Sequence, residues 1–246
     1  MTSVPDTAAT FLRSRALHIF AALALLTFSC GAARAEGDLL WAGYVGFTTD
    51  RIVRGLSWTA GRPSAQIGGE VEWQREWFAG FYLANVDYVE SPRNPLDRHI
   101  ELDVYAGYRK AYDNFAWDAT AVRYNYPGDS RYDYYEGSVG LHYLDRFSLL
   151  VNRSFEALSP LDAGGSVEFR ASHHATGRLS FTGGVGYRHY KRKSWDFVYA
   201  DAGVALLLGP VTLDLRAYTT FDEDDYFYTS QAGGDRIVFS ITFGGN

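Results

Sequence analysis

The sequence predicts an all-β protein, a transmembrane antiparallel up-and-down β-barrel of about twelve strands. Three observations predict this fold. Apolar and polar residues alternate with a period of two in many segments after residue 38. Short and long connections alternate between these segments, and aromatic residues recur near the segment ends. An outer-membrane barrel has the same three properties, because its strands face lipid on one side and its lumen on the other.

The first 35 residues have the layout of a secretory signal peptide. Arg13 and Arg15 precede the apolar run Ile19–Phe28, and the small-residue triplet Ala33-Arg34-Ala35 follows. The run is about half as long as the ~20 residues that a membrane-spanning helix needs. We therefore expect cleavage after this triplet, which leaves residues 36–246 as the barrel domain.

Cysteine and charge narrow the function classes. Cys30 is the only cysteine, so the barrel domain has no disulfide. A lipoprotein signal at Cys30 is the weaker alternative, because residues 27–29 lack the leucine expected there. Residues 1–35 contain three of the basic residues and one acidic residue, so 20 basic and 28 acidic residues remain, a net charge of −8. This argues against nucleic acid as a partner, since binding it needs a basic footprint.

Twelve segments are expected to be strands, and most reach the ~9–11 residues of a tilted membrane strand, against ~5–6 in soluble sheets. The segment 77–89 is apolar on both faces, so its orientation is left open. The expected strands are 39–52, 61–74, 77–89, 99–111, 115–126, 132–144, 147–155, 164–173, 178–190, 195–208, 210–221 and 234–244.

The connections alternate in length. Outer-membrane barrels have short periplasmic turns and longer outer loops, whereas a soluble sandwich has no reason to keep this alternation. The short turns are 74–76, 112–114, 144–146, 175–177 and 209–210. The longer connections are 53–60, 90–98, 127–131, 156–163, 191–194 and 222–233.

Aromatic residues predict a girdle at each membrane interface, where the ring is buried and its polar group stays wet. The alternative is packing between strands of a soluble core. Near the short turns lie Trp41, Trp73, Trp77, Phe115, Trp117 and Tyr143. Near the long connections lie Tyr88, Tyr126, Trp195 and Phe221. The tyrosines of the stretch 123–137 are expected to anchor the outer rim, with Tyr134 and Glu136 pointing inward.

The polar face of each strand should point into the lumen, because a charge at mid-membrane costs several kcal/mol. The candidate pore-lining residues on strands are Glu101, Asp103, Arg109, Tyr134, Glu136, Glu168, Arg170, Arg188, Asp214 and Arg216. Arg51 and Arg54, near the top of the first strand, are expected at the pore mouth. These charges either form a selective constriction or pair into a ladder that fills a narrow lumen.

No catalytic, metal or cofactor site is predicted. His173 and His174 are neighbours on a strand and point to opposite faces, so they do not share a metal easily. The acidic run 222–225 lacks the spacing of a calcium loop and is expected to be a solvated outer loop near lipopolysaccharide. The partners expected are outer-membrane lipid, lipopolysaccharide and the outer-membrane assembly machinery.

An outer-membrane lipid-modifying enzyme is a weaker alternative. It would need a Ser-His pair in hydrogen-bonding contact. The candidate pairs are His142 with Ser138 and His174 with Ser172, but residues of one strand that share a face are about 7 Å or more apart. Neither pair makes contact without help from another strand.

Six pieces of sequence occur in order along the chain: TTDRIVRGLS (48–57), AQIGGEVEW (65–73), GFYLANVDY (80–88), HIELDVYAGY (99–108), YNYPGDSRYDYYEG (124–137) and YADAGVAL (199–206). Together they resemble the TorF family of proteobacterial outer-membrane proteins. The resemblance covers most of the barrel domain and implies a bacterial outer-membrane barrel with a pore role, but no functional residue is transferred from it. The sequence departs from outer-membrane proteins in general at its end, where Gly244-Gly245-Asn246 follows Phe243 in place of a final aromatic residue.

The leading hypothesis is therefore a porin-like outer-membrane barrel for passive diffusion of small solutes or ions. The alternative of another class is a barrel with a closed lumen that has a structural or adhesive role.

Overall fold

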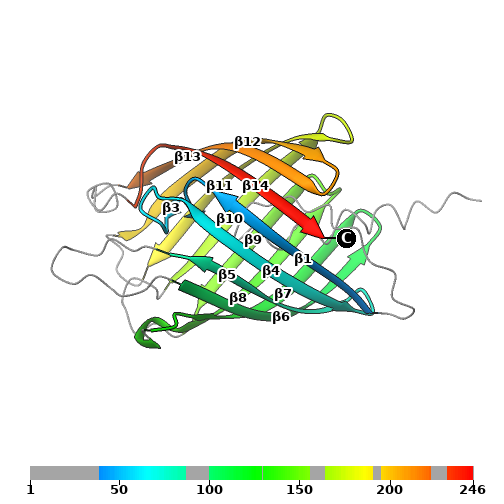
Figure 1. Cartoon of the computed structure of the whole chain (residues 1–246). Coiled ribbons are helices and arrows are strands. Elements are labelled where there is room, and N and C mark those ends of the chain that lie inside the picture. Colours follow the sequence, from blue (N-terminus) through cyan, green and yellow to red (C-terminus); the bar gives the residue numbers. More distant parts are fainter. Residues whose placement is uncertain are drawn as a thin grey trace, which may run out of the picture.

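A closed barrel is the main feature of the computed structural model, which describes residues 39–86, 100–128, 130–155, 164–190, 195–222 and 232–245. Within these residues, twelve antiparallel strands follow one another around the barrel, and β1 closes it against β14 (Figure 1). The predicted all-β barrel is thus confirmed. The expected signal peptide lies outside the described residues.

The barrel strands agree with the predicted segments to within four residues, and the largest differences are at the ends of the first and third segments. They are β1 (Leu39–Thr48), β4 (Ser64–Trp73), β5 (Trp77–Asn85), β6 (Ile100–Tyr112), β7 (Phe115–Asn125), β8 (Tyr134–Tyr143), β9 (Phe147–Ser154), β10 (Gly164–His174), β11 (Leu179–Tyr190), β12 (Phe197–Leu208), β13 (Val211–Asp222) and β14 (Arg236–Gly245). A separate two-stranded sheet pairs β2 (Ile52–Val53) with β3 (Leu56–Ser57), and a 3-10 helix, η3, spans Ser130–Tyr132.

Short connections gather at one end of the barrel (Figure 1). The short ones are residues 74–76, 113–114, 144–146, 175–178 and 209–210, close to the turns predicted. The long connections begin with residues 49–63, which are fully described, and much of the others falls outside the described residues. The acidic run expected in an outer loop is among the latter, apart from the backbone of Asp222.

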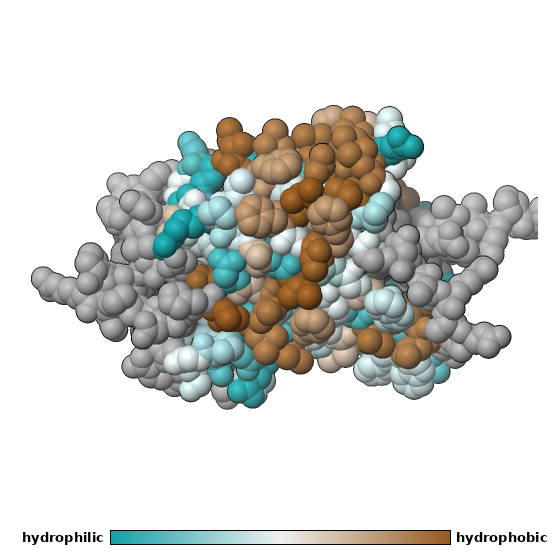
Figure 2. Space-filling model, viewed as in Figure 1, coloured by the Kyte–Doolittle hydropathy of each residue, from teal (hydrophilic) through white to brown (hydrophobic). Residues whose placement is uncertain are grey.

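The two faces of the barrel wall differ in chemistry as the period of two predicts. On β6, Asp103 faces the lumen and is fully buried, whereas its neighbour Val104 is 51% exposed on the outer face. Hydrophobic side chains cover much of the outer face that is visible in Figure 2. β5 is oriented by the same rule, since Phe78 and Tyr82 are buried and Phe81 is exposed. No helix of the described residues is long and apolar enough to cross a membrane.

The aromatic girdle near the short turns has the predicted exposure, since Trp41, Trp73 and Trp77 are each more than half exposed. Near the long connections the prediction is partly wrong. Phe221 is exposed, but Tyr124 and Tyr126 are buried in the lumen and do not anchor the rim. The reason is their position, because alternate residues of β7 from Asp118 onward point inward. Tyr88 lies outside the described residues.

Candidate functional site: a hairpin inside a charged lumen

The lumen is filled by charged and aromatic side chains that contact one another. All ten strand residues proposed to line it face inward, and apart from Arg109, whose side chain is 12% exposed, all are buried: Glu101, Asp103, Tyr134, Glu136, Glu168, Arg170, Arg188, Asp214 and Arg216. The register around Tyr134 is also the predicted one, because Tyr135 is exposed on the outer face. The ring of Tyr134 stacks on that of Tyr124, with centroids 4.3 Å apart.

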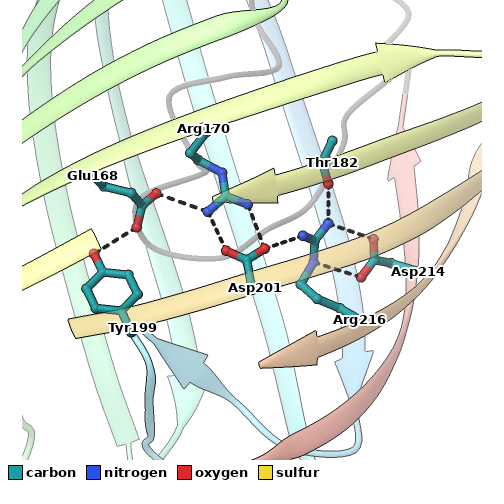
Figure 3. Close-up of polar contacts among 7 residues, drawn as sticks. All are labelled: Glu168, Arg170, Thr182, Tyr199, Asp201, Asp214 and Arg216. Carbon is teal, nitrogen blue, oxygen red and sulfur yellow. Dashed lines mark hydrogen bonds and ion pairs between the residues drawn. The ribbon is translucent and has the colours of Figure 1, made fainter. Parts of the chain in front are cut away.

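One network runs across the wall itself (Figure 3). Arg170 on β10 donates to Glu168 at 3.0 Å and, through two nitrogens, to Asp201 on β12 at 2.9 Å each. Arg216 on β13 also donates to Asp201, and pairs with Asp214 at 3.2 Å. We call these five residues the wall ladder. Every member lies on a barrel strand, so the backbone pairing of β10 to β13 fixes the network.

The wall ladder explains why the charges tolerate burial. Alternating signs and bidentate arginine geometry compensate the loss of water around each group. Further hydroxyl groups complete the network, since Tyr199 donates to Glu168 at 2.8 Å and Arg216 donates to Thr182 at 2.5 Å. Asp201 is the central acceptor, and the sequence analysis did not select it. Its position two residues after Tyr199, on the same face of the strand, was the available signal.

The second network involves residues 49–63, which we call the inserted hairpin. The first strand was expected to extend to residue 52, but β1 ends at Thr48 and the chain then turns into the lumen. β2 and β3 form the hairpin, and Asp50 holds it together by accepting hydrogen bonds from the hydroxyls of Ser57 at 2.6 Å and Thr59 at 2.9 Å. The predicted end of the first strand at residue 52 is therefore wrong, and Arg51 and Arg54, expected near the top of that strand, lie on the hairpin.

Arg51 and Arg54 attach the inserted hairpin to acidic residues of the wall. Arg51 forms an ion pair with Glu101 on β6, and its Nε donates to the hydroxyl of Tyr82 at 2.9 Å. Arg54 binds both carboxylate oxygens of Glu136 on β8, at 2.7 and 2.5 Å. We call the contacts of Arg51 with Glu101 and Tyr82 the Arg51 clamp, and the contacts of Arg54 with Glu136 the Arg54 clamp.

The inserted hairpin also reaches the opposite wall. The carbonyl of Gly55 accepts a hydrogen bond from Thr220 of β13 at 2.6 Å. Gly55 has a φ of +82°, and a Cβ there would lie 2.4 Å from the Cβ of Tyr199, so only glycine fits without displacement. The hairpin thus spans the lumen from β1 to β6, β8 and β13. It obstructs this level of the barrel, where Thr59 and Thr220 are fully buried.

Toward the short-turn end the lumen carries a third group of charges. Arg109 pairs with Glu70 at 2.6 Å and with Glu72 at 3.3 Å, and its guanidinium lies over the ring of Phe78. Glu70 and Glu72 were not selected from the sequence. Their alternation with Val71 on β4 is the signal that places both on the inward face.

His142, paired with Ser138 in the enzyme alternative, also lies in the lumen, and its ring nitrogens are near residues of the two neighbouring strands. Its Nε2 lies 2.6 Å from Asp118 of β7, and its Nδ1 lies 3.1 Å from Ser148 of β9. These groups face away from the outer surface of the barrel. No group of three or more His, Cys, Asp or Glu in the described part of the chain could hold a metal ion.

A closed barrel with an apolar exterior and a charged, obstructed lumen defines a porin-like barrel. Residues 32–242 match the family described as "Bacterial protein of unknown function (Gcw_chp)", and the chain belongs to that family. This family carries a different label from TorF, so the TorF resemblance remains a prediction. No curated protein sequence matches the chain significantly.

Solved porins have a similar fold. The KdgM porin is similar with a TM-score of 0.54 at 7% identity, over 82% of this chain and 98% of that chain, and it has also been solved in complex with disordered oligogalacturonate. The NanC porin is similar with a TM-score of 0.50 at 8% identity, over 82% of this chain and 97% of that chain. At these identities the similarity establishes the fold alone.

Proposed function

We propose that the protein is an exported outer-membrane barrel that passes small solutes or ions by passive diffusion, and that the inserted hairpin controls the passage. The observation that carries the proposal is the hairpin itself. Its two strands do not pair with the barrel strands. Two arginine clamps attach it inside the lumen, together with contacts to Thr220, Ala232 and Arg236. A side chain contact of this kind can open without disrupting the barrel, because the barrel hydrogen bonds do not include it.

The apolar outer surface of the barrel supports the outer-membrane location. A band of exposed apolar side chains on closed antiparallel strands satisfies the two requirements of hydrocarbon, which are apolar contact and paired backbone groups. The signal peptide expected in residues 1–35 would supply export. Cell fractionation should find the protein with outer-membrane lipid, and mass spectrometry should find a chain that begins after Ala35.

Planar-bilayer recordings test the passage of solutes. We expect small, infrequent channel steps from the folded wild-type chain, and larger, longer steps from the double variant Arg51→Ala/Arg54→Ala, because both clamps are then lost. Folding is checked first by heat-dependent migration on a gel. The proposal fails if both folded proteins give no steps.

A second function, a structural or adhesive role, is favoured by the burial of the side chains inside the lumen. If the hairpin never leaves, the protein is a closed barrel with a structural or adhesive role through its outer loops. Absence of steps from both folded proteins, together with an intact outer-membrane location, would support this function.

A further inference from the structure

We propose that the pocket now occupied by Arg51 is a binding site for a small organic cation of the guanidinium type, and that Arg51 occupies it in place of that solute. The inference rests on the proposed function, because it names the class of solute that the lumen takes once the inserted hairpin leaves. Its test below measures binding in detergent, without current, so the two proposals can fail separately.

The pocket has the chemistry of a cation site. Glu101 and Asp103 are two residues apart on β6 and point inward together, and both are fully buried. Glu101 pairs with the Arg51 guanidinium through one oxygen and accepts a hydrogen bond from Tyr126 at 2.9 Å through the other. The ring of Tyr82 lies 5.1 Å from the guanidinium carbon, a cation–π distance. Carboxylates beside an aromatic face are suited to a planar organic cation.

The pocket holds two carboxyl groups, and Arg51 pairs with only one of them. Neither carboxylate oxygen of Asp103 has a hydrogen-bond partner in the described part of the chain, and Arg51 leaves its Nη1 without one as well. A buried carboxylate without a partner is costly unless a proton or a cation compensates it. Asp103 is therefore a second observation, beside the Arg51–Glu101 pair, that points to a cationic ligand.

The Arg54 clamp contains no carboxylate that would be left without an arginine. Glu136 lies between Arg54 and Arg188, and the Nη1 of Arg188 is 4.0 Å from it. If Arg54 leaves, Glu136 keeps an arginine of the wall beside it. If Arg51 leaves, Glu101 and Asp103 lose their guanidinium. The acids Glu101 and Glu136 are paired with Arg51, Arg54 and Arg188 while the hairpin is in place, and only Arg188 stays beside them once it has left. The departing hairpin also takes Asp50 away from Arg236 of β14. Rings of acidic side chains favour cations, so the open lumen selects them.

Chemical complementation in detergent tests the site. The full chain with Arg51→Ala has a vacancy of the size and charge of the lost guanidinium, and ethylguanidinium chloride is the probe. Isothermal titration should show binding to this variant that is at least about tenfold tighter than to wild type. The reason is that a buried carboxylate without its partner is destabilised, and the probe restores the partner. The matched control is Arg54→Ala, which removes the same side chain from the same hairpin but leaves Glu136 beside Arg188. It should bind no more tightly than wild type.

Two further variants assign the binding to the acids. Adding Glu101→Gln or Asp103→Asn to Arg51→Ala should remove the gain. The proposal is overturned if Arg51→Ala binds no better than Arg54→Ala, or if the gain survives both acid substitutions. If Arg51→Ala does not fold, the comparison moves to Arg51→Met, which keeps the apolar stem of the side chain, and to the matched Arg54→Met. Equal binding to these two proteins would then reject the site.

Discussion

The wall ladder and the clamps of the inserted hairpin use the same groups, arginines paired with carboxylates inside one lumen, but they differ in what holds the arginines. In the wall ladder, Arg170 and Arg216 project from barrel strands, so the pairs persist as long as the barrel does. In the clamps, Arg51 and Arg54 project from a segment outside the barrel pairing. The same kind of ion pair is therefore fixed by strand pairing in the wall ladder and depends on the docking of a connection in the clamps. In the function we propose, the clamps act as a latch.

Replacing the hairpin should have the largest effect on conductance. Thr48 pairs directly with Ser64, so a short Gly-Ser turn can join β1 to β4 in place of residues 50–61. We expect an intact barrel with channel steps several-fold larger than those of wild type. Bilayer recordings of both proteins check this. Unchanged steps would mean that the wall ladder, and not the hairpin, restricts the lumen.

Loss of a ladder arginine should have the largest effect on stability. Arg216→Ala leaves Asp201 and Asp214 buried with less compensation, and we expect a loss of about 3–5 kcal/mol in the free energy of unfolding. Urea unfolding in lipid vesicles measures it. Arg153→Ala is the control, because this arginine is exposed on the outer face of β9, and should change stability by less than about 0.5 kcal/mol. Equal losses in the two variants would contradict a structural role for the ladder.

Weakening one clamp should change the docking of the inserted hairpin more than the stability of the barrel. Glu136→Gln removes the charge that Arg54 binds, which should weaken docking of the hairpin by about 1.5–3 kcal/mol. We expect more frequent channel opening, with a smaller fall in the free energy of unfolding than Arg216→Ala causes. A fall in unfolding stability as large as that of Arg216→Ala would show that the Arg54 clamp stabilises the barrel as much as the wall ladder does.

A change at the hairpin tip should have the smallest of these effects. Gly55→Ala places a methyl group against Tyr199 and strains a left-handed backbone, at a cost of roughly 1–3 kcal/mol to local docking. Limited proteolysis should cut this variant within residues 49–63 faster than it cuts wild type. Gly177→Ala is the control, because nothing lies within 4 Å of a Cβ there. Equal cleavage of the two variants would argue against a close fit at Gly55.

Strand residues of the site could be predicted from the sequence because alternation determines which face a side chain occupies. Glu101, Asp103 and Glu136 were placed in the lumen by this rule alone, and the structure places them there. Asp201 was missed because small residues on both sides of it blur the alternation in 199–204. Once the barrel closes, its inward position follows from that of Tyr199.

The inserted hairpin could not be predicted, because no periodic rule governs a connection. Its position depends on contacts with β6, β8 and β13, which are distant in sequence. Arg51 and Arg54 were recognised as functional candidates, yet whether they faced the mouth or the interior depended on how the chain turned after Thr48. Tyr126 was misplaced for a related reason. Its proximity to a loop suggested the membrane interface, but it continues the inward-facing alternation of β7 and contacts Glu101.

The cross-lumen contacts of the inserted hairpin also impose an order on folding. Residues 49–63 precede nearly all of the barrel in sequence, but Thr220, the residue of the far wall that holds Gly55, lies on the penultimate strand. The carbonyl of Ala232, which accepts a hydrogen bond from the backbone N–H of Ser57 at 2.7 Å, comes later still. The hairpin therefore cannot complete its docking until almost the whole chain is in place. The segment that follows the first barrel strand is therefore among the last to reach its final position.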